Sequence, residues 1–206
     1  MTPVRLVLAG VGAWGRHLAR LAAGSPRVAL VGLVDPDPEA LAAAAWRAPV
    51  ARPFARLDEA LGLAPDAVVV ATPARSHRAL AAAALEAGAA VLVEKPLATS
   101  SADAESLVAL AQRRRAVAMV GHLLRYHPAI ERLLDEVRRG TIGRPRHLHS
   151  ARRSPPGRAS DVSALWALGP HDVSLLLALD GAGPEGLAVA ARGDDEVSVQ
   201  GQPRPG

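Results

Sequence analysis

The sequence predicts an α/β fold built on a doubly wound parallel sheet, and three observations support this prediction. Between Val4 and Val120, short apolar runs alternate with alanine-rich helical stretches, a pattern typical of βαβ units. The apolar runs are unbroken, as expected for strands that helices cover on both faces. A glycine-rich turn joins the first apolar run to the first helical stretch.

The elements of this first region are expected in the following order. The strands are Val4–Ala9, Val28–Val34, Ala67–Ala71, Ala90–Val93 and Val117–Val120. The helices between them are Trp14–Ala23, Pro38–Ala48, Ser76–Ala87 and Ser101–Arg113. Gly24 and Gly88 stand where helix C-terminal caps belong.

A second region begins after Gly121, where this alternation ends. The expected helices are Pro128–Arg139 and a stretch within Leu165–Leu179 that is entered through Gly169-Pro170-His171-Asp172. The expected strands are Arg146–Ser150, Leu187–Ala191 and Glu196–Val199. We therefore expect one domain over residues 1–121, a partial second domain over residues 122–200 and a disordered tail over residues 201–206.

The composition is that of a folded globular protein, with 50% hydrophobic and 21% charged residues. No apolar run approaches the roughly 18 residues of a membrane span. The apolar start is broken by glycines and has no signal-peptide cleavage site, so we expect a cytoplasmic protein. The chain contains no Cys, which excludes disulfides, thiolate metal sites and cysteine nucleophiles, and we expect no metal site.

The charge balance raises the question of nucleic-acid binding. The pI is about 10.8 at a formal net charge of only +4, because nearly all the basic side chains are Arg. However, aromatic residues make up only 2% of the chain, so bases would find few stacking partners, and acidic residues are interleaved with the Arg residues. We therefore expect no nucleic-acid partner.

The glycine-rich turn, Gly10-Val11-Gly12-Ala13-Trp14-Gly15, has the G-x-G-x-x-G pattern of dinucleotide-binding Rossmann folds. It lies between the first strand and the first helix, which is the context that this pattern requires. Gly10 permits the tight turn, Gly12 lets a pyrophosphate approach the backbone, and Gly15 lets the helix pack closely on the strand. The helix N-terminus, with Ala13 and Trp14, supplies N–H donors to the phosphates. The alternative is a set of ordinary turn glycines.

Asp35 ends the second strand, where a carboxylate can accept hydrogen bonds from the ribose hydroxyls of NAD. The same carboxylate would repel a 2′-phosphate, and no Arg directly follows it. We therefore expect NAD(H) to be favoured over NADP(H), although NADP remains an option. The alternative for Asp35 is an Asx-turn before Pro36.

Lys95 is the only lysine of the chain, and it lies just past the fourth predicted strand, at the sheet edge where such folds bind ligands. A partly desolvated ammonium can give up a proton, whereas an Arg guanidinium stays charged. Lys95 is therefore a candidate for proton transfer. The alternative is a surface lysine without a function.

These motifs resemble those of the Gfo/Idh/MocA oxidoreductases, NAD(P)-dependent enzymes that mostly oxidise or reduce sugars and sugar derivatives. The resemblance covers about residues 4–180. Its motifs are the glycine turn, Ala71-Thr72-Pro73 with His77, Glu94-Lys95-Pro96, Gly121-His122 and Gly169-Pro170-His171-Asp172. Thr-Pro with His77, followed by Glu-Lys-Pro, is the most specific part of the pattern.

The resemblance implies roles for several of these residues. Thr72, Pro73 and His77 would line the nicotinamide half of the cofactor, and Glu94 and Lys95 would lie beside the reacting carbon. Without the family, Pro73 is equally well explained as a turn and His77 as a helix-start residue. Arg125 and His127 resemble substrate-side residues, although capping of the next helix explains His127 equally well.

His171 matches the active-site histidine of the family, which would accept the hydroxyl proton as hydride leaves for the nicotinamide. The alternative is a helix-start histidine bonded to backbone. Four residues earlier the family usually has an Asp that completes a Lys–Asp–His group, but this chain has Ala167. Asp172 and Asp161 are candidates to replace that carboxylate.

The family's second domain is an α+β unit on a large, mostly antiparallel sheet, and its members are longer than this chain. The resemblance therefore implies a truncated α+β substrate domain, whether from a truncated reading frame, natural reduction or a fragment. An incomplete sheet exposes edges, so we expect a homo-oligomer. Arg153 and Arg158, in the Arg- and Pro-rich loop, resemble residues that meet a nucleotide-sugar phosphate or carboxylate; a solvated loop is the alternative.

Two hypotheses follow for function. The first is an NAD(P)-dependent oxidoreductase that transfers hydride between nicotinamide and a sugar or nucleotide-sugar carbinol or ketone, with Lys95 and His171 handling protons. The second is a non-catalytic or degenerate dinucleotide-binding protein of the same fold, which Ala167 and the short second domain motivate.

Overall fold

The computed structural model of this chain describes residues 2–143, 149–151, 161–180, 185–192 and 196–202. The chain divides into two compact units, residues 1–121 and residues 122–206. In the part of the chain that is described, no helix is both long and apolar enough to cross a membrane.

The first unit is built on a parallel sheet. Its strands are β1 (Val4–Ala9), β2 (Val28–Val34), β3 (Arg52–Phe54), β4 (Ala67–Val70), β5 (Ala90–Val93) and β6 (Ala118–Val120). They lie in the order β3-β2-β1-β4-β5-β6, and every neighbouring pair is parallel. This is the Rossmann strand order, so the predicted fold class is confirmed. In such sheets ligands bind at the carboxyl ends of the strands, where the order reverses between β1 and β4.

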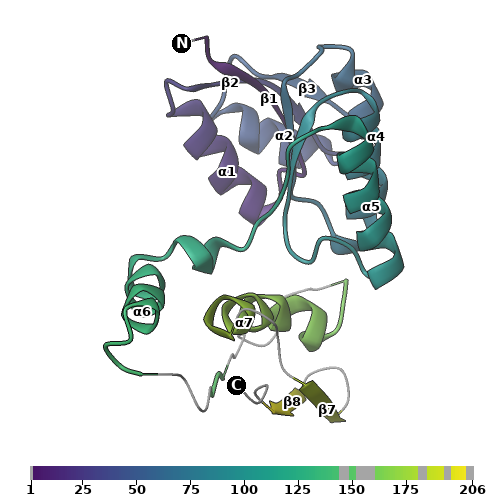
Figure 1. The fold of residues 1–206 in the computed structure, drawn as a ribbon. Helices are drawn as coiled ribbons and strands as arrows, with labels where there is room; N and C mark the ends of the chain where they lie inside the picture. Colours follow the sequence, from purple (N-terminus) through teal and green to yellow (C-terminus); the bar gives the residue numbers. More distant parts are fainter. Residues whose placement is uncertain (1, 144–148, 152–160, 181–184, 193–195, 203–206) are drawn as a thin grey trace. The chain divides into compact units, whose positions relative to one another are not determined.

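Helices cover both faces of this sheet. They are α1 (Ala13–Ala23), α2 (Pro38–Ala45), α3 (Leu57–Leu61), α4 (Ala74–Glu86) and α5 (Ser101–Arg114). Figure 1 shows α1 on one side of the strands and α4 with α5 on the other. Because successive strand side chains point to opposite faces, Val7 packs with α3, α4 and α5, whereas Leu8 packs with α1 and α2. Leu8 is 1% exposed, and full burial of such a side chain contributes about 1.5–3 kcal/mol.

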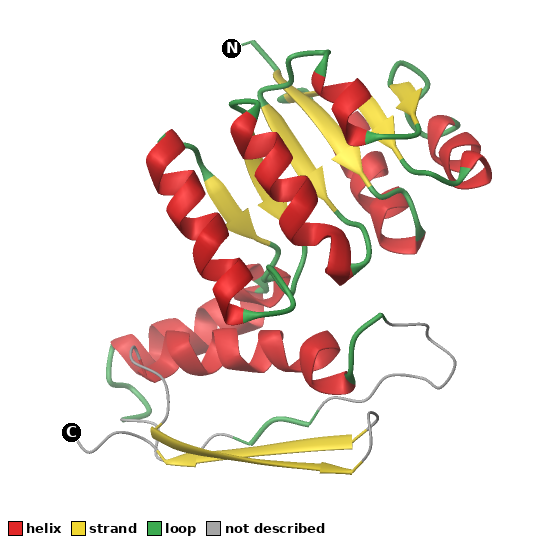
Figure 2. Ribbon diagram, turned by 90° about the vertical axis from the view of Figure 1, so that its right-hand side faces the viewer, coloured by secondary structure: helices red, strands yellow, loops and turns green. Residues whose placement is uncertain are grey.

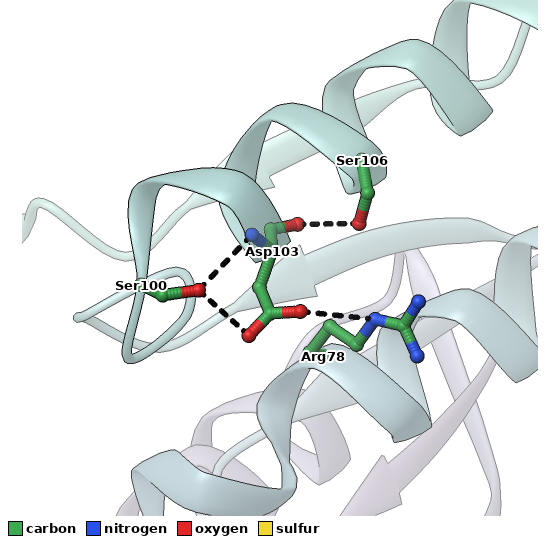
Figure 3. A network of polar contacts seen from close by, with 4 residues as sticks. All are labelled: Arg78, Ser100, Asp103 and Ser106. Atoms are coloured by element: carbon green, nitrogen blue, oxygen red, sulfur yellow. Dashed lines mark hydrogen bonds and ion pairs between the residues drawn. The ribbon is translucent and has the colours of Figure 1, made fainter.

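The N-terminus of α5 carries a polar network that fixes the loop before it (Figure 3). Ser100 accepts a hydrogen bond from the Asp103 N–H at 3.1 Å and donates its own hydroxyl to the Asp103 carboxylate at 2.8 Å. Arg78 of α4 lies 3.4 Å from the other Asp103 oxygen. Ser106 donates to the Asp103 carbonyl. The network ties the start of α5 to α4.

The first unit differs from the predicted elements in two ways. β3 and α3 were not expected. β3 has only three residues, with Pro53 in the middle, and α3 has only five, so neither gives a periodic pattern in the sequence. α2 ends at Ala45 instead of Ala48, because the next residues form turns.

The second unit contains a 3₁₀ helix η1 (Leu123–Tyr126), α6 (Pro128–Arg138), α7 (Ala164–Asp180), β7 (Glu185–Arg192) and β8 (Glu196–Gln202). β7 and β8 form an antiparallel hairpin, drawn as the long pair of arrows in Figure 2. The hairpin contacts α7 through β8.

Three predictions for this unit need correction. α7 begins at Ala164, so Gly169-Pro170 lies inside the helix and does not form its entrance. Gly201 and Gln202 belong to β8, so the prediction of a disordered tail is wrong for these two residues. Residues 203–206 lie outside the described residues. In the predicted strand 146–150, residues 149–150 form no strand, and the remainder lies outside the described residues.

Candidate functional site

The glycine turn after β1 is closely packed except at one position. Gly10 has a φ of +88°, and a Cβ there would lie 2.5 Å from the Ala71 carbonyl oxygen at the end of β4. A Cβ on Gly15 would collide with the Gly10 carbonyl oxygen. At Gly12, in contrast, a Cβ would meet nothing within 4 Å. The turn therefore presses against β4 and leaves open space in front of Gly12.

The helix that follows has an N-terminus suited to an anion. Gly12 is the N-cap of α1, so no side chain satisfies the first N–H groups, and the first turn contains no acidic residue. The N–H groups of the first helical turn, which includes Ala13 and Trp14, lack intrahelical acceptors. Such donors, together with the helix dipole, bind phosphate groups. The open space at Gly12 and these donors fit the pyrophosphate of a dinucleotide.

Asp35 links this turn to the loop after β2. Its Oδ2 accepts the Val11 N–H at 2.9 Å, and its Oδ1 accepts the Asp37 N–H at 3.0 Å. A carboxylate offers about four acceptor positions, so both oxygens keep capacity for further donors. The arrangement fits ribose hydroxyls beside the pyrophosphate site.

His77 of α4 is buried behind the loop that follows β4. Its ring is 1% exposed, with Nδ1 2.7 Å from the Pro96 carbonyl oxygen and Nε2 2.9 Å from the Thr72 carbonyl oxygen. His77 therefore ties the Thr72-Pro73 loop to the Glu94-Lys95-Pro96 loop. Its predicted place beside the nicotinamide half of the cofactor stays a prediction.

The loop after β5 carries two charged residues of the predicted site, Glu94 and Lys95. Glu94 accepts a hydrogen bond from the indole N–H of Trp14, with 2.7 Å between Oε1 and Nε1. Lys95 is half-buried beside it. Because β1, β4 and β5 are adjacent in the sheet, the loops with Gly12, Thr72 and Lys95 lie along one edge.

The described site candidates of the second unit lie on η1, at the start of α6 and on α7. His171 is nearly buried at 9% exposed, and its carbonyl oxygen accepts the Ser174 hydroxyl at 2.7 Å. Arg125 donates from Nη1 to the Ser174 carbonyl oxygen at 3.1 Å. Ala167 lies about one turn before His171 on α7. Asp172, one candidate for the missing carboxylate, accepts the Ser150 hydroxyl at 2.7 Å.

His127 caps α6, because its Nδ1 accepts the Ala129 N–H at 3.2 Å. This contact corresponds to the capping explanation that the sequence left open, and a substrate role stays a prediction. Arg153 and Arg158 lie outside the described residues. Among the residues that are described, no group of three or more His, Asp or Glu residues could hold a metal ion.

Two contacts at this edge were not predicted from the sequence. Ser76 donates its hydroxyl to the Thr72 hydroxyl oxygen and to the Pro73 carbonyl, each at 2.7 Å, and so fixes the loop after β4. Gly121 lies so close to Glu94 that a Cβ would be 2.9 Å from the carboxylate. A serine three residues after Pro73 was a visible signal for a loop-fixing hydroxyl, whereas nothing in the sequence joins Gly121 to Glu94.

The strand order, the glycine turn open at Gly12 and the Asp35 carboxylate together define a dinucleotide-binding Rossmann protein. The family model for the Gfo/Idh/MocA oxidoreductases, described as "Oxidoreductase family, NAD-binding Rossmann fold", matches residues 4–122. The chain belongs to this family, as the sequence motifs predicted.

Individual relatives agree with this assignment. UDP-N-acetylglucosamine 3-dehydrogenase of Acidithiobacillus ferrooxidans is 37% identical over 186 residues, which are 89% of this chain and 56% of that protein. The solved structure of UDP-N-acetylglucosamine 3-dehydrogenase GnnA from the same organism has a TM-score of 0.83. The match covers 97% of this chain and 65% of that chain. Inositol 2-dehydrogenase of Corynebacterium glutamicum (strain R) is 33% identical, covering 74% of this chain and 46% of that protein.

A further solved structure is that of GenD2 from gentamicin A biosynthesis in complex with NAD. It has a TM-score of 0.79 at 29% identity and covers 95% of this chain and 60% of that one. The chain thus spans about half the length of the curated relatives it matches.

Proposed function

We propose that this chain carries the cofactor site and the proton-handling residues of an NAD-dependent oxidoreductase that acts on a CH–OH group of a sugar or nucleotide sugar. The observation that carries the proposal is one sheet edge that combines an open glycine turn, the Asp35 carboxylate and the lone Lys95. The relatives named as UDP-N-acetylglucosamine and inositol dehydrogenases support this substrate class.

In this proposal the first unit holds the dinucleotide. The N–H groups at the start of α1 bind the pyrophosphate, and Asp35 accepts the ribose hydroxyls. Bound nicotinamide supplies the hydride acceptor or donor. Thr72, Pro73 and Glu94 line its surroundings. NAD is favoured over NADP because the Asp35 carboxylate repels a 2′-phosphate.

Lys95 and His171 handle the hydroxyl proton in the proposed reaction. Oxidation of a carbinol releases a proton from oxygen as hydride leaves carbon, so a base has to accept it. His171 is the proposed acceptor at Nε2, because its Nδ1 is buried. The Lys95 Nζ orients the substrate oxygen and exchanges protons with it. Arg125, His127, Arg153 and Arg158 are the proposed substrate-side residues.

The second candidate function is a non-catalytic or degenerate dinucleotide-binding protein, which Ala167 favours. An orienting carboxylate beside a catalytic histidine can contribute several orders of magnitude to a rate, as in serine proteases. At position 167 this chain has a methyl group instead. Both candidates bind NADH, so only turnover separates them.

The test is NAD reduction with a panel of inositols, sugars and UDP-sugars, beside NADH titration. We expect turnover that Lys95→Met abolishes while NADH still binds. Arg114→Met, which removes an exposed cation at the end of α5, is the matched control and keeps the wild-type rate. No wild-type turnover on any substrate would favour the non-catalytic protein. A large gain in turnover rate in Ala167→Asp would indicate an active site that lacks only the carboxylate of its Lys–Asp–His group.

The proposed setting is a cytoplasmic homo-oligomer without a nucleic-acid partner. The small number of aromatic residues and the interleaved charges support the absence of nucleic acid. The β7–β8 hairpin supports association, since a two-stranded sheet is marginal alone and offers edges for pairing. Light scattering of the purified protein should give a mass at least twice 21.3 kDa, and a mass of one chain would refute the oligomer.

A further inference from the structure

Glu94 contacts two other segments at the carboxyl edge of the sheet, the first turn of α1 and the residue after β6. Its carboxylate accepts the indole N–H of Trp14, which lies in the first turn of α1. It also lies against Gly121, which directly follows β6; a Cβ on Gly121 would be 2.9 Å from Cδ, Oε1 and Oε2. The Glu94 side chain therefore links the start of α1 to the ends of β5 and β6.

Gly121 has no backbone reason to be a glycine, because its φ lies outside the left-handed region. A Cβ there would instead require the Glu94 carboxylate, at the end of its flexible side chain, to move. The backbone around the pair is itself fixed, since the Gly121 N–H donates to the Val93 carbonyl and the Glu94 N–H donates to the Val70 carbonyl, each at 2.8 Å. The Glu94 carboxylate thus lies against the fixed backbone of Gly121 on one side and the Trp14 indole on the other.

Trp14 connects this carboxylate to the phosphate-binding turn. It is the second residue of α1, so its backbone N–H belongs to the unpaired donors at the helix N-terminus. Trp14 is 40% exposed, so burial alone does not hold its side chain in place. A hydrogen bond to a charged acceptor is about twice as strong as a neutral one and can fix such a side chain.

We propose that Glu94 is a positioning residue: seated on Gly121, it holds Trp14 and thereby fixes the first turn of α1 in the orientation that binds the cofactor's pyrophosphate. The proposal rests on NAD(H) binding by the first unit. In this proposal, the missing side chain of Gly121 leaves room for the Glu94 carboxylate. The indole of Trp14 serves to hold the start of α1 through its hydrogen bond to Glu94.

The test is NADH affinity, measured by fluorescence titration of the full chain. We expect Glu94→Ala and Trp14→Phe each to weaken binding about tenfold, and the double variant to be no weaker than either one, because both remove the same bond. Glu94→Gln should recover most of the loss, since its amide oxygen still accepts from the indole. Trp46→Phe, at a tryptophan 83% exposed and far along the chain, is the control.

Gly121→Ala gives a second, independent measurement. Its methyl group would displace the carboxylate, so it should weaken NADH binding in the wild-type background and have little effect in Glu94→Ala. Without cofactor, in a chain whose Trp46 and Trp166 are replaced by Phe, Glu94→Ala should increase acrylamide quenching of the Trp14 emission.

Three outcomes would overturn the inference while NADH binding stands: additive losses in the double variant, a Glu94→Gln variant as weak as Glu94→Ala, or unchanged quenching of Trp14. A wild-type chain that fails to bind NADH would overturn the proposed function as well, and is thereby distinguished from these outcomes.

Discussion

Both oxygens of Asp35 accept a backbone N–H, one from the glycine turn and one from the loop after β2. The residue therefore shapes the nucleotide site in addition to presenting a charge to it. Asn at this position keeps one acceptor but turns an amide N–H toward a backbone donor, which leaves that donor unsatisfied.

We expect Asp35→Asn to lower NADH affinity at least about tenfold and to narrow the preference for NADH over NADPH, because the repelling charge is lost. Asp66→Asn is the matched control: the Asp66 carboxylate also accepts a backbone N–H, from Arg5 at 2.8 Å, but at the opposite end of β1. Fluorescence titration with both cofactors measures the effect. An unchanged NADPH to NADH affinity ratio would contradict the assigned role.

Gly10 and Gly88 allow the packing at the glycine turn to be measured separately from backbone strain. Their φ values are +88° and +87°, but a Cβ meets the end of β4 at Gly10 and nothing within 4 Å at Gly88. We expect Gly88→Ala to cost about 1 kcal/mol of unfolding free energy and Gly10→Ala clearly more, about 3 kcal/mol or above. Urea denaturation measures both, and equal losses would mean that the turn can move away from β4.

At the scale of residues, the sequence predicted the candidate site residues more successfully than it predicted their contacts. The glycine turn and the place of Asp35 follow from local spacing, and the structure shows the positive φ of Gly10 and the close packing of Gly15. The cofactor roles of these residues stay predictions. The bonds of His77 and of Glu94 to distant loops could not be predicted, because they depend on side-chain orientation between segments up to 80 residues apart.

At the scale of elements, the start of α5 shows which contacts set stability. Ser100 is the N-cap of the helix, and the Arg78–Asp103 ion pair beside it has side chains that are 55% and 43% exposed (Figure 3). N-cap loss costs about 1 kcal/mol, whereas exposed ion pairs contribute between about 0 and 1 kcal/mol. The cap should therefore outweigh the ion pair.

We expect Ser100→Ala to lower the free energy of unfolding by about 1 kcal/mol and Arg78→Ala by less than half of that. Ser106→Ala, within the same helix, is the control and should be neutral or slightly stabilising, because Ala is the better helix former. Chemical denaturation in low and high salt checks the ranking. A larger loss in Arg78→Ala than in Ser100→Ala would show that the ion pair is the stronger contact.

Long periodic elements were predictable, and short or interrupted ones were not. The strands of the central sheet and the long helices carry unbroken apolar or amphipathic patterns. β3 is too short for a pattern, and α7 was misjudged because Pro170 favours the first turn of a helix, whereas the apolar residues from Ala164 onward extend the helix before it. A proline inside a helix removes one backbone bond, which tertiary packing has to offset.

At the scale of the whole molecule, the first unit contains its own sheet and the packed side chains around Val7 and Leu8 on the two faces of that sheet. Since domains with their own core can fold alone, we expect residues 1–121 expressed separately to unfold cooperatively and to bind NADH within a few-fold of the full chain. Circular dichroism melting and NADH titration test this. A fragment that is unfolded, or folded without NADH affinity, would mean that the second unit completes the cofactor site.

Lys95, half-buried after β5, is the only lysine among 24 basic residues, and this has a practical consequence for spectroscopy. Amine-directed reagents can therefore modify only the Lys95 side chain and the terminal amine. Reductive methylation with ¹³C-formaldehyde would therefore place a single side-chain NMR label beside the proposed reacting carbon, and its chemical shift would follow the charge of that amine as cofactor and sugar are added.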